Sequence, residues 1–460
     1  MNADRGRALE FQEIQGYHLE QAHRYLSELG PLDEAGIAIG IDAANRLGSA
    51  GRRAFARSDM NAAANLLGRA SALLAEQHPT RLALLPELGE ALMELGEFVE
   101  ARKVLAEAAA AAERAGDERI KASAMLVGMC VRMYSGEPGE WGAEALGVAQ
   151  AAIPLLERAD AQAELAIAWR LIGFVHGVAG RYLQAKEATV CYMAHARKAG
   201  NVRLVARGAL SFAIGALSGP TPVPEAITEC ERIIADGLTD RHVQGVIMCV
   251  LAQLRAMNGE FDEARKLYRH GRALLHDLGQ GVSAASTAID LARVELLAGD
   301  LAGAEKEVRA DFEFLKQKGE TYLLSSMAAV LARIVRDAGR DEDAHALSLT
   351  VEGIAADDDI DAQVQWRAVR APILARLGDF VNAEELARSA LELARSSDAP
   401  ILQADTICEL AEVLRLAGRA EEALGVIGEA IDLYLAKGDL ISGRRAATWA
   451  ADVGKSLPRP

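Results

Sequence analysis

The chain has 460 residues, of which 51% are hydrophobic, 25% charged and only 5% aromatic. At roughly 150 residues per domain this length corresponds to about three domains, unless the chain is a repeat array without one growing core. The apolar and charged fractions exclude a disordered chain, and the shortage of aromatic residues favours packed helices over a β-sandwich. The net charge of -16 excludes general affinity for nucleic acid or anionic membranes, because both require a basic surface.

The N-terminal residues contain no apolar run of the kind that forms a secretory signal. The longest uncharged stretch, residues 208–224, is interrupted by Gly, Ser and Pro and is not a membrane span. The five cysteines are odd in number and form no Cys-x-x-Cys pair, which favours reduced core thiols over disulfides or a zinc site. We therefore expect a cytoplasmic protein. The cysteines are Cys130, Cys191, Cys230, Cys249 and Cys408.

Residues 1–35 are predicted to form a helical lead-in, with a helix from about residue 9 to residue 29. The sequence from Glu13 to Gly30, with residues 46–54 and 61–67 after it, resembles a junction found in large actinobacterial signalling ATPases. In these class III adenylate or guanylate cyclases and LuxR-type regulators, the junction links an AAA-type or NB-ARC-type ATPase to C-terminal repeats. The resemblance implies that the chain acts as the sensor arm of such a regulator.

The catalytic parts of those regulators are not expected in this chain. A phosphate-binding loop needs the pattern Gly-x-x-x-x-Gly-Lys-Ser/Thr, whereas the Gly-Lys-Ser sequence at residues 454–456 has Trp449 in place of the first Gly. The repeats described below leave no length for a cyclase domain. We therefore expect no nucleotide binding, no cofactor and no catalytic residues.

A six-residue pattern, Gly-Asp/Glu/Arg-x-x-x-Ala, repeats along the chain. Seven clear copies begin at Gly96, Gly180, Gly259, Gly299, Gly339, Gly378 and Gly418. Three weaker copies end at Ala63, Ala145 and Ala226. The closing alanines of all ten copies are separated by 40 residues on average, and such a fixed period is typical of repeat architectures.

Each repeat is predicted to form two helices. The Gly ends the first helix in a left-handed conformation, and an acidic residue after it favours the start of the second helix. The closing Ala, for example Ala383, leaves room for two helices to approach closely. Apolar-small pairs such as Leu331-Ala332 lie seven to eight residues before the Gly, on the first helix.

This pattern resembles the tetratricopeptide repeat, which has a Leu-Gly or Leu-Ala pair in the first helix, a Gly-Asp-Tyr-type turn and an Ala in the second. The resemblance implies an all-α fold, a right-handed superhelical solenoid of about ten helix pairs over residues 36–438. The period of 40 exceeds the usual ~34 residues, so we expect both helices to be longer by about a turn. Residues 439–460 are expected to form a capping helix, from about residue 440 to residue 453, and a tail.

Residues 218–224, Ser-Gly-Pro-Thr-Pro-Val-Pro, form the strongest break in the helical pattern. They are either a hinge between two sub-arrays or one irregular turn inside a continuous solenoid.

The first helices are expected to line a concave groove, in which basic residues of the later repeats would bind a ligand. Counting six, three and two residues back from each turn Gly gives the candidate contacts Arg293, Arg333, Arg336, Arg376 and Arg415. Such a basic strip suits an acidic peptide or an anionic small effector, since guanidinium groups bind carboxylates and phosphates. The alternative is that these arginines pair with neighbouring acids such as Asp337 and Glu412.

Three other motifs imitate known sites without meeting their requirements. His18 and His23 are five residues apart, so they do not share the helix face that a zinc site needs. Asp357, Asp359 and Asp361 begin like a calcium loop but lack its Gly and Glu, and they are interpreted as an acidic turn and helix N-cap. Residues 279–284 imitate a dinucleotide fingerprint, but a helical pattern precedes them instead of a strand. No metal site is therefore expected.

The sequence thus predicts a non-enzymatic repeat scaffold that binds a protein or small effector in signal transduction or transcriptional regulation. The alternative is the C-terminal sensor fragment of an ATP-dependent adenylate cyclase or LuxR-type regulator whose catalytic domains lie outside this chain. No direct nucleic-acid or membrane partner is expected, and the oligomeric state is left open.

Overall fold

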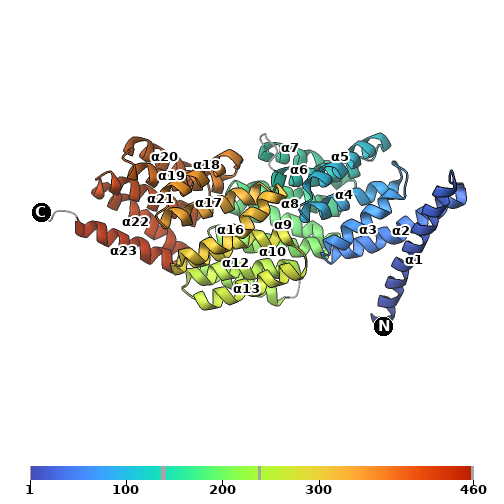
Figure 1. Ribbon diagram of the computed structural model, residues 1–460, viewed down its shortest axis with the longest axis horizontal. Coiled ribbons are helices and arrows are strands. Elements are labelled where there is room, and N and C mark those ends of the chain that lie inside the picture. The colour runs from blue at the N-terminus through green and yellow to red at the C-terminus, as the bar shows by residue number, and fades with distance from the viewer. Residues whose placement is uncertain (1, 136–140, 237–239, 457–460) are drawn as a thin grey trace. The chain divides into compact units, whose positions relative to one another are not determined.

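A computed structural model describes residues 2–135, 141–236 and 240–456. These residues form helices joined by short turns, and the described ranges contain no strand (Figure 1). The predicted all-α solenoid of tetratricopeptide-like helix pairs is confirmed.

The chain divides into two compact units. Unit 1 comprises residues 1–132, 147–168 and 195–203, and unit 2 comprises residues 133–146, 169–194 and 204–460. The helices of unit 1 alone are α1 (Asn2–Leu29), α2 (Glu34–Ala56), α3 (Met60–Ala72), α4 (Pro79–Glu94) and α5 (Phe98–Ala115). Five helices have residues in both units: α6 (Glu118–Ser135), α7 (Trp141–Arg158), α8 (Gln162–Val178), α9 (Tyr182–Lys198) and α10 (Val202–Ser218).

The remaining helices belong to unit 2. They are α11 (Val223–Ala235), α12 (Arg241–Met257), α13 (Phe261–Asp277), α14 (Gly281–Ser286), α15 (Ala288–Ala298), α16 (Leu301–Lys318), α17 (Tyr322–Asp337), α18 (Asp341–Ile354), α19 (Ile360–Arg376), α20 (Phe380–Arg395), α21 (Pro400–Leu416), α22 (Ala420–Lys437) and α23 (Leu440–Ser456). One predicted first helix is broken in two, α14 and α15. The break lies at Thr287. The hydroxyl of Thr287 donates a hydrogen bond to the backbone carbonyl of Ala284, three residues earlier.

The turn glycines confirm the register of the repeat. All seven glycines of the clear copies have a positive φ, between 64° and 87°, which side chains with a Cβ rarely adopt. Each of them therefore ends the first helix of its unit. Asp300 and Asp379, which follow two of these glycines, each accept a hydrogen bond from the backbone three residues on and cap the second helix.

The closing alanines lie at helix contacts, as predicted. Nine of the ten are completely buried: Ala63, Ala101, Ala145, Ala226, Ala264, Ala304, Ala344, Ala383 and Ala423. The tenth, Ala185, is partly buried. Only a small side chain fits where two helix backbones approach this closely, because protein interiors are densely packed.

The first helices of unit 2 lie side by side. Helices α12, α15, α17 and α19 each contact the first helix of the next unit along the chain, which are α15, α17, α19 and α21 respectively. The second helices, α13, α16, α18, α20 and α22, pack against the first helix of their own unit. Unit 2 therefore has two layers, and its apolar cores lie between them.

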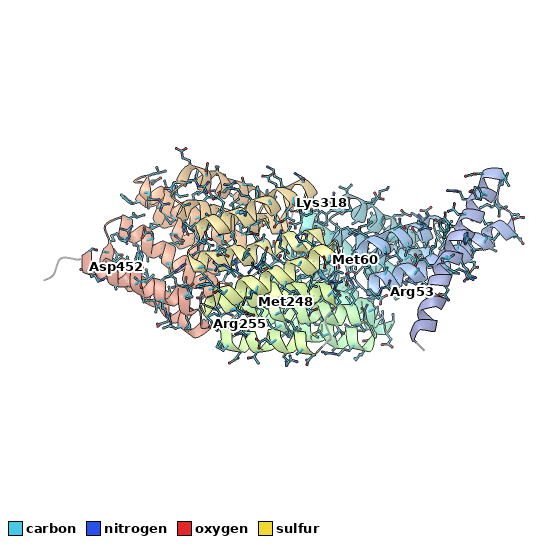
Figure 2. The ribbon with its side chains drawn as sticks, turned by 60° about the horizontal axis from the view of Figure 1, so that its bottom comes forward. Arg53, Met60, Met248, Arg255, Lys318 and Asp452 are labelled. Carbon is cyan, nitrogen blue, oxygen red and sulfur yellow. The ribbon has the colours of Figure 1, made fainter. Side chains whose placement is uncertain are left out.

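Ion pairs join successive units near the turns. Arg340 pairs with Glu305, and Arg419 pairs with Glu384, each 35 residues away. Arg255, labelled in Figure 2 at the last turn of α12, pairs with Glu231 on α11 and with Glu260 in the turn that follows its own helix. These pairs are partly exposed and contribute about 0–1 kcal/mol each, so they set register more than stability.

The segment from Ser218 to Pro224 joins α10 and α11 within unit 2, and it is not the boundary between the two units. The ammonium group of Lys437 donates hydrogen bonds to the carbonyls of Ala216, Gly219 and Thr221. The structure thus ties this proline-rich turn to α22.

Candidate functional site

Contacts between helices two units apart identify the concave side of unit 2. Arg333 on α17 forms an ion pair with Asp405 on α21, 72 residues away. Arg336, one turn along α17, donates to Glu409, also on α21, at 2.7 Å. Side chains two units apart can meet only on the side toward which the array curves, so this face is the inner one.

We call the polar residues gathered on this face the inner cluster. They share a position on, or next to, the first helices, and their charges act on one another. Its members are Tyr182, Asp290, Arg293, Arg333, Arg336, Asp361, Asp405, Glu409 and Tyr434.

Asp405 lies at the centre of the inner cluster. It accepts hydrogen bonds from Arg333 and from the phenol of Tyr434 on α22. Burial alone would raise the pKa of Asp405, but the charge of Arg333 and these hydrogen bonds lower the pKa below its usual value. The side chains of Arg333 and Asp405 keep 38% and 27% of their surface exposed, so solvent reaches them.

Arg336 is on the same helix face but is not available to a ligand. Its side chain is 8% exposed, and its guanidinium donates to Asp337 at 2.8 Å and to Glu409 at 2.7 Å. A further hydrogen bond, of 3.4 Å, goes to the carbonyl of Ala368. Arg336 therefore holds α17, α19 and α21 together.

The structure does not bring Arg376 and Arg415 into the inner cluster. Arg376 is exposed at the last turn of α19 and binds both carboxylate oxygens of Asp341, at 2.6 and 2.7 Å. Arg415 binds Glu412 of its own helix, at 2.6 and 2.7 Å. The pairing with neighbouring acids that the sequence left open as an alternative therefore forms at these positions.

Arg293 differs from the other four predicted arginines, because it forms no ion pair in the described structure. It is half-buried on α15, and its charge acts on Asp290, Asp361, Asp405 and Tyr182. Desolvation raises the pKa of Asp290 to about 7, although a hydrogen bond from Gln253 and the charge of Arg293 oppose that rise. Burial likewise raises the pKa of Asp361.

These contacts correct the expectation of a basic strip. The inner cluster contains four carboxylates, Asp290, Asp361, Asp405 and Glu409, against the three guanidiniums of Arg293, Arg333 and Arg336. Two of those guanidiniums are already neutralised by α21. The face is therefore mixed in charge.

The residues that sequence reasoning missed are the acids and Tyr434. Asp405 and Glu409 lie two units beyond the arginines that they bind, and Tyr434 lies on a second helix. The 40-residue period predicts which face of each first helix points to the inner side. It does not predict which helices face one another across that side. A search for acids four residues apart on a later first helix could have found Asp405 and Glu409.

The motifs that imitate known sites have structural roles or none. Asp359 caps α19 by accepting from the backbone N–H of Ala362 at 3.2 Å, as predicted. A helix, α13, precedes residues 279–284, as the sequence indicated. Within the described residues, no group of three or more His, Cys, Asp or Glu side chains is arranged to hold a metal ion. No helix in that part of the chain combines the length and hydropathy of a membrane span.

One pair of side chains resembles a nucleophile and its base. The hydroxyl of Ser283 lies 2.9 Å from Nε2 of His242, and the guanidinium of Arg207 lies 3.4 Å from the same nitrogen. His242 is only 2% exposed, so a substrate could not approach the pair without rearrangement of the helices. The contact is therefore best explained as packing between α10, α12 and α14.

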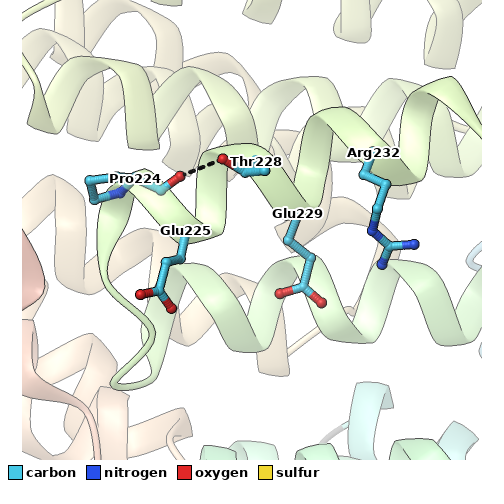
Figure 3. Close-up of a pocket in the computed structure, with 5 residues that line it drawn as sticks. All are labelled: Pro224, Glu225, Thr228, Glu229 and Arg232. Atoms are coloured by element: carbon cyan, nitrogen blue, oxygen red, sulfur yellow. Dashed lines mark hydrogen bonds between the residues drawn. The ribbon is translucent and has the colours of Figure 1, made fainter.

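A surface depression of about 430 Å³ lies along α11 (Figure 3). Its lining residues, Pro224, Glu225, Thr228, Glu229 and Arg232, come from one face of this single helix, and Glu225, Glu229 and Arg232 point to the same side. With no second element contributing side chains, the depression has no set of converging groups and is not a better candidate than the inner cluster.

Comparisons with known proteins give only a fold-level likeness. No protein-family model matches the sequence, and no curated protein matches it. Among solved structures, the human IFIT1 dimer with m7Gppp-AAAA is 14% identical with a TM-score of 0.47, covering 96% of this chain and 95% of that one. Yeast Tom70 is 13% identical with a TM-score of 0.40, covering 98% and 96%. A Rap protein complexed with competence and sporulation factor is 10% identical with a TM-score of 0.41, covering 81% and 97%. With TM-scores below 0.5, these likenesses carry no argument about ligands or partners.

Proposed function

We propose that the chain is a non-enzymatic repeat scaffold that binds a protein, a peptide or a small effector through the inner cluster of unit 2. The observation that carries this proposal is Arg293, a half-buried guanidinium without an ion pair among three carboxylates on the concave face. The nearby carboxylates compensate the charge of Arg293, but none forms an ion pair with it, so its guanidinium can donate hydrogen bonds to a ligand.

The chemistry of the cluster indicates the kind of ligand. Arg293 offers a planar fork for a carboxylate or phosphate, which fits an acidic peptide or an anionic effector. Asp290 and Asp361 lie near it and would bind a cationic or hydrogen-bond-donating group of the same ligand. Because these residues come from α15, α17, α19 and α21, an extended ligand could contact four successive units.

A role in signal transduction or transcriptional regulation is part of the proposal and rests on the resemblance of residues 13–67 to the junction in signalling ATPases. The same resemblance is the support for the alternative, a C-terminal sensor region of an ATP-dependent cyclase or LuxR-type regulator. In either case the inner cluster would be the sensing site.

The test is to capture partners from a lysate of the source cells with the purified chain, and then to measure their affinity. Replacing Arg293 by Ala should weaken a captured partner at least tenfold, which corresponds to about 1.4 kcal/mol. The double change Arg333→Ala and Arg336→Ala should also weaken it, although part of that loss would reflect the broken contacts between α17 and α21.

The matched control is Arg376→Ala, because Arg376 is also an arginine of a first helix but lies exposed at the end of α19, outside the cluster. It should retain full affinity. Binding should also weaken with salt, since exposed charges are screened over ~8 Å at physiological ionic strength. Full affinity in a folded Arg293→Ala chain would contradict the proposal and place the contact elsewhere.

A further inference from the structure

Four successive turns of the C-terminal half of unit 2 meet turns of its N-terminal half. The backbone N–H of Thr321 donates to the carbonyl of Tyr134 at 2.8 Å, 187 residues away. The next three turns, about 40 residues apart, contribute Asp358, Asp398 and Lys437. Their partners lie 215–221 residues earlier in the chain, so the array of unit 2 returns to itself after about five repeats. We call this line of contacts the seam.

Asp358 and Asp398 cap helices that are not their own. The carboxylate of Asp358 accepts from the N–H of Gly142 at 2.7 Å, in the first turn of α7. Asp398 accepts from the N–H groups of Tyr182 and Leu183 at 2.7 and 2.8 Å, at the start of α9. A carboxylate at a helix N-terminus is favoured both by the free N–H groups and by the helix dipole.

Lys437 makes the corresponding contact at a helix C-terminus. Its side chain is 1% exposed, and its ammonium donates to the carbonyls of Ala216, Gly219 and Thr221 at 2.7, 2.7 and 2.6 Å. These carbonyls belong to the last turn of α10 and to the turn after it. An ammonium group has three N–H donors, so this arrangement uses all of them.

The seam and the inner cluster share the same turns. The backbone N–H of Tyr182 donates to Asp398 of the seam. The charges of Asp361 and Arg293, both in the cluster, shift the pKa of its phenol in opposite directions. On α22, Tyr434 donates to Asp405 one turn before Lys437 enters the seam. The cluster and the seam are therefore one helical turn apart on α22.

We propose that the seam is a latch, that unit 2 exchanges between the closed form described here and a form opened along the seam, and that the inner cluster holds the latch closed. The hydrogen bonds of the seam join charged side chains to helix ends. Water can replace them there when the seam opens, whereas separating helix pairs would expose the apolar cores. Opening along the seam would break these hydrogen bonds and the edge-to-face contact between the rings of Tyr134 and Tyr322, but it would leave the cores between the helix pairs intact. Control of the latch by a ligand rests on the proposed function, but the latch itself does not.

The experiment measures the distance between spin labels on the two sides of the seam in the full chain. Lys186 on α9 and Glu392 on α20 are exposed and are changed to Cys for labelling. The two partly exposed native thiols are removed by Cys191→Ser and Cys408→Ala, and the other three cysteines are buried. The parent chain should give one dominant short distance. The double change Asp358→Ala and Asp398→Ala should increase the fraction at longer distance at least threefold.

Two controls separate opening of the seam from general loosening. Asp379→Ala removes a carboxylate that caps its own helix, α20, and should leave the distances unchanged. Labels at Glu392 and Asp432, which lie on α20 and α22 on the same side of the seam, should keep one distance in every variant. An unchanged distance across the seam in a folded double variant would overturn the proposal.

If the double variant does not fold, the parent chain in mild urea gives the same test. The long-distance fraction should appear before the helical circular dichroism falls, and a single distance up to the unfolding transition would overturn the latch.

The link to the cluster is tested by Tyr434→Phe, which removes the hydrogen bond to Asp405 and keeps the ring. It should raise the open fraction at least twofold without any ligand present, and an unchanged fraction would show that the cluster does not hold the latch.

Discussion

Glu90 in unit 1 and Arg333 in unit 2 occupy the same place in their repeats, six residues before the turn Gly, yet their surroundings differ. Glu90 pairs with Arg203 at 3.2 Å, and the two side chains are 5% and 2% exposed. Arg203 also pairs with Glu94, and its guanidinium stacks on the ring of Phe55 at 4.2 Å. Arg333 pairs with Asp405, but the two side chains keep 38% and 27% of their surface exposed.

The same repeat position is therefore sealed in one unit and partly exposed in the other. In unit 1 the charges are sealed by neighbouring helices, so removing one partner leaves a buried charge. In unit 2 the pair faces the concave side, where solvent screens it, and we propose that a ligand competes for one partner there. Position within the repeat predicts the direction of a side chain but not its role.

The largest expected effect tests the sealed cluster. Arg203→Met leaves Glu90 and Glu94 without their guanidinium, and breaking a buried pair in this way costs about 3–5 kcal/mol. All four tryptophans, Trp141, Trp169, Trp366 and Trp449, belong to unit 2. Urea unfolding should therefore show a transition at lower urea by circular dichroism, with a smaller shift of the transition followed by tryptophan fluorescence. Coincident shifts of both signals would show that the two units do not unfold separately.

A smaller effect is expected in unit 2 for Lys437→Met. The change removes the donor for three backbone carbonyls, and a buried polar group left unsatisfied costs about 1–3 kcal/mol. The tryptophan transition should shift to lower urea. Arg395→Met, which removes an exposed pair with Glu429, is the control and should shift it by less than about 1 kcal/mol. Equal shifts would mean that Lys437 is no better satisfied than a surface residue.

The repeat register of unit 2 is tested by Ala383→Leu. Ala383 is completely buried where α20 packs, so a larger side chain overpacks the contact at about 1–3 kcal/mol. A lower midpoint in tryptophan-monitored unfolding is expected. An unchanged midpoint would mean that the helices do not approach closely at this position.

The smallest expected effect is the contribution of Asp359 to the pH dependence of unit 2. Burial raises the pKa of Asp359 to about 7 and the pKa of Glu320 to about 8. Both carboxyls bind protons more tightly folded than unfolded, so their contribution to stability is fully present below about pH 4 and is lost as pH rises through 7 to 8. Between pH 6 and pH 8, Asp359 alone should lower the free energy of unfolding by about 1 kcal/mol. Asp359→Asn should flatten this dependence, and a tryptophan midpoint that rises with pH would contradict it.

The sequence predicted the fold and its register because the backbone itself requires glycine where φ is positive and alanine where two helices approach closely. Gly339 and Gly378 have the left-handed conformation that ends a helix, and Ala344 and Ala383 are fully buried. These residues act locally, so a linear pattern is enough to place them.

The candidate site was predicted only in part, because it depends on contacts between distant units. Arg293 and Arg333 were placed on one face by the period, but their neighbours Asp405 and Tyr434 depend on how tightly the array winds. The seam depends on the same winding, and no local pattern marks Asp398 as a cap for a helix 216 residues away. The division into two units also has no signal in the repeat period.

The most direct test of the central claim is the reactivity of individual arginines with phenylglyoxal in the unmodified, folded chain, followed by mass spectrometry. If the inner cluster of unit 2 is open and the equivalent cluster of unit 1 is sealed, Arg293 and Arg333 should react at least tenfold faster than Arg203. Arg336, which has carboxylate partners on two sides, should be protected like Arg203. Arg203 reacting as fast as Arg293 would contradict the distinction between the two units.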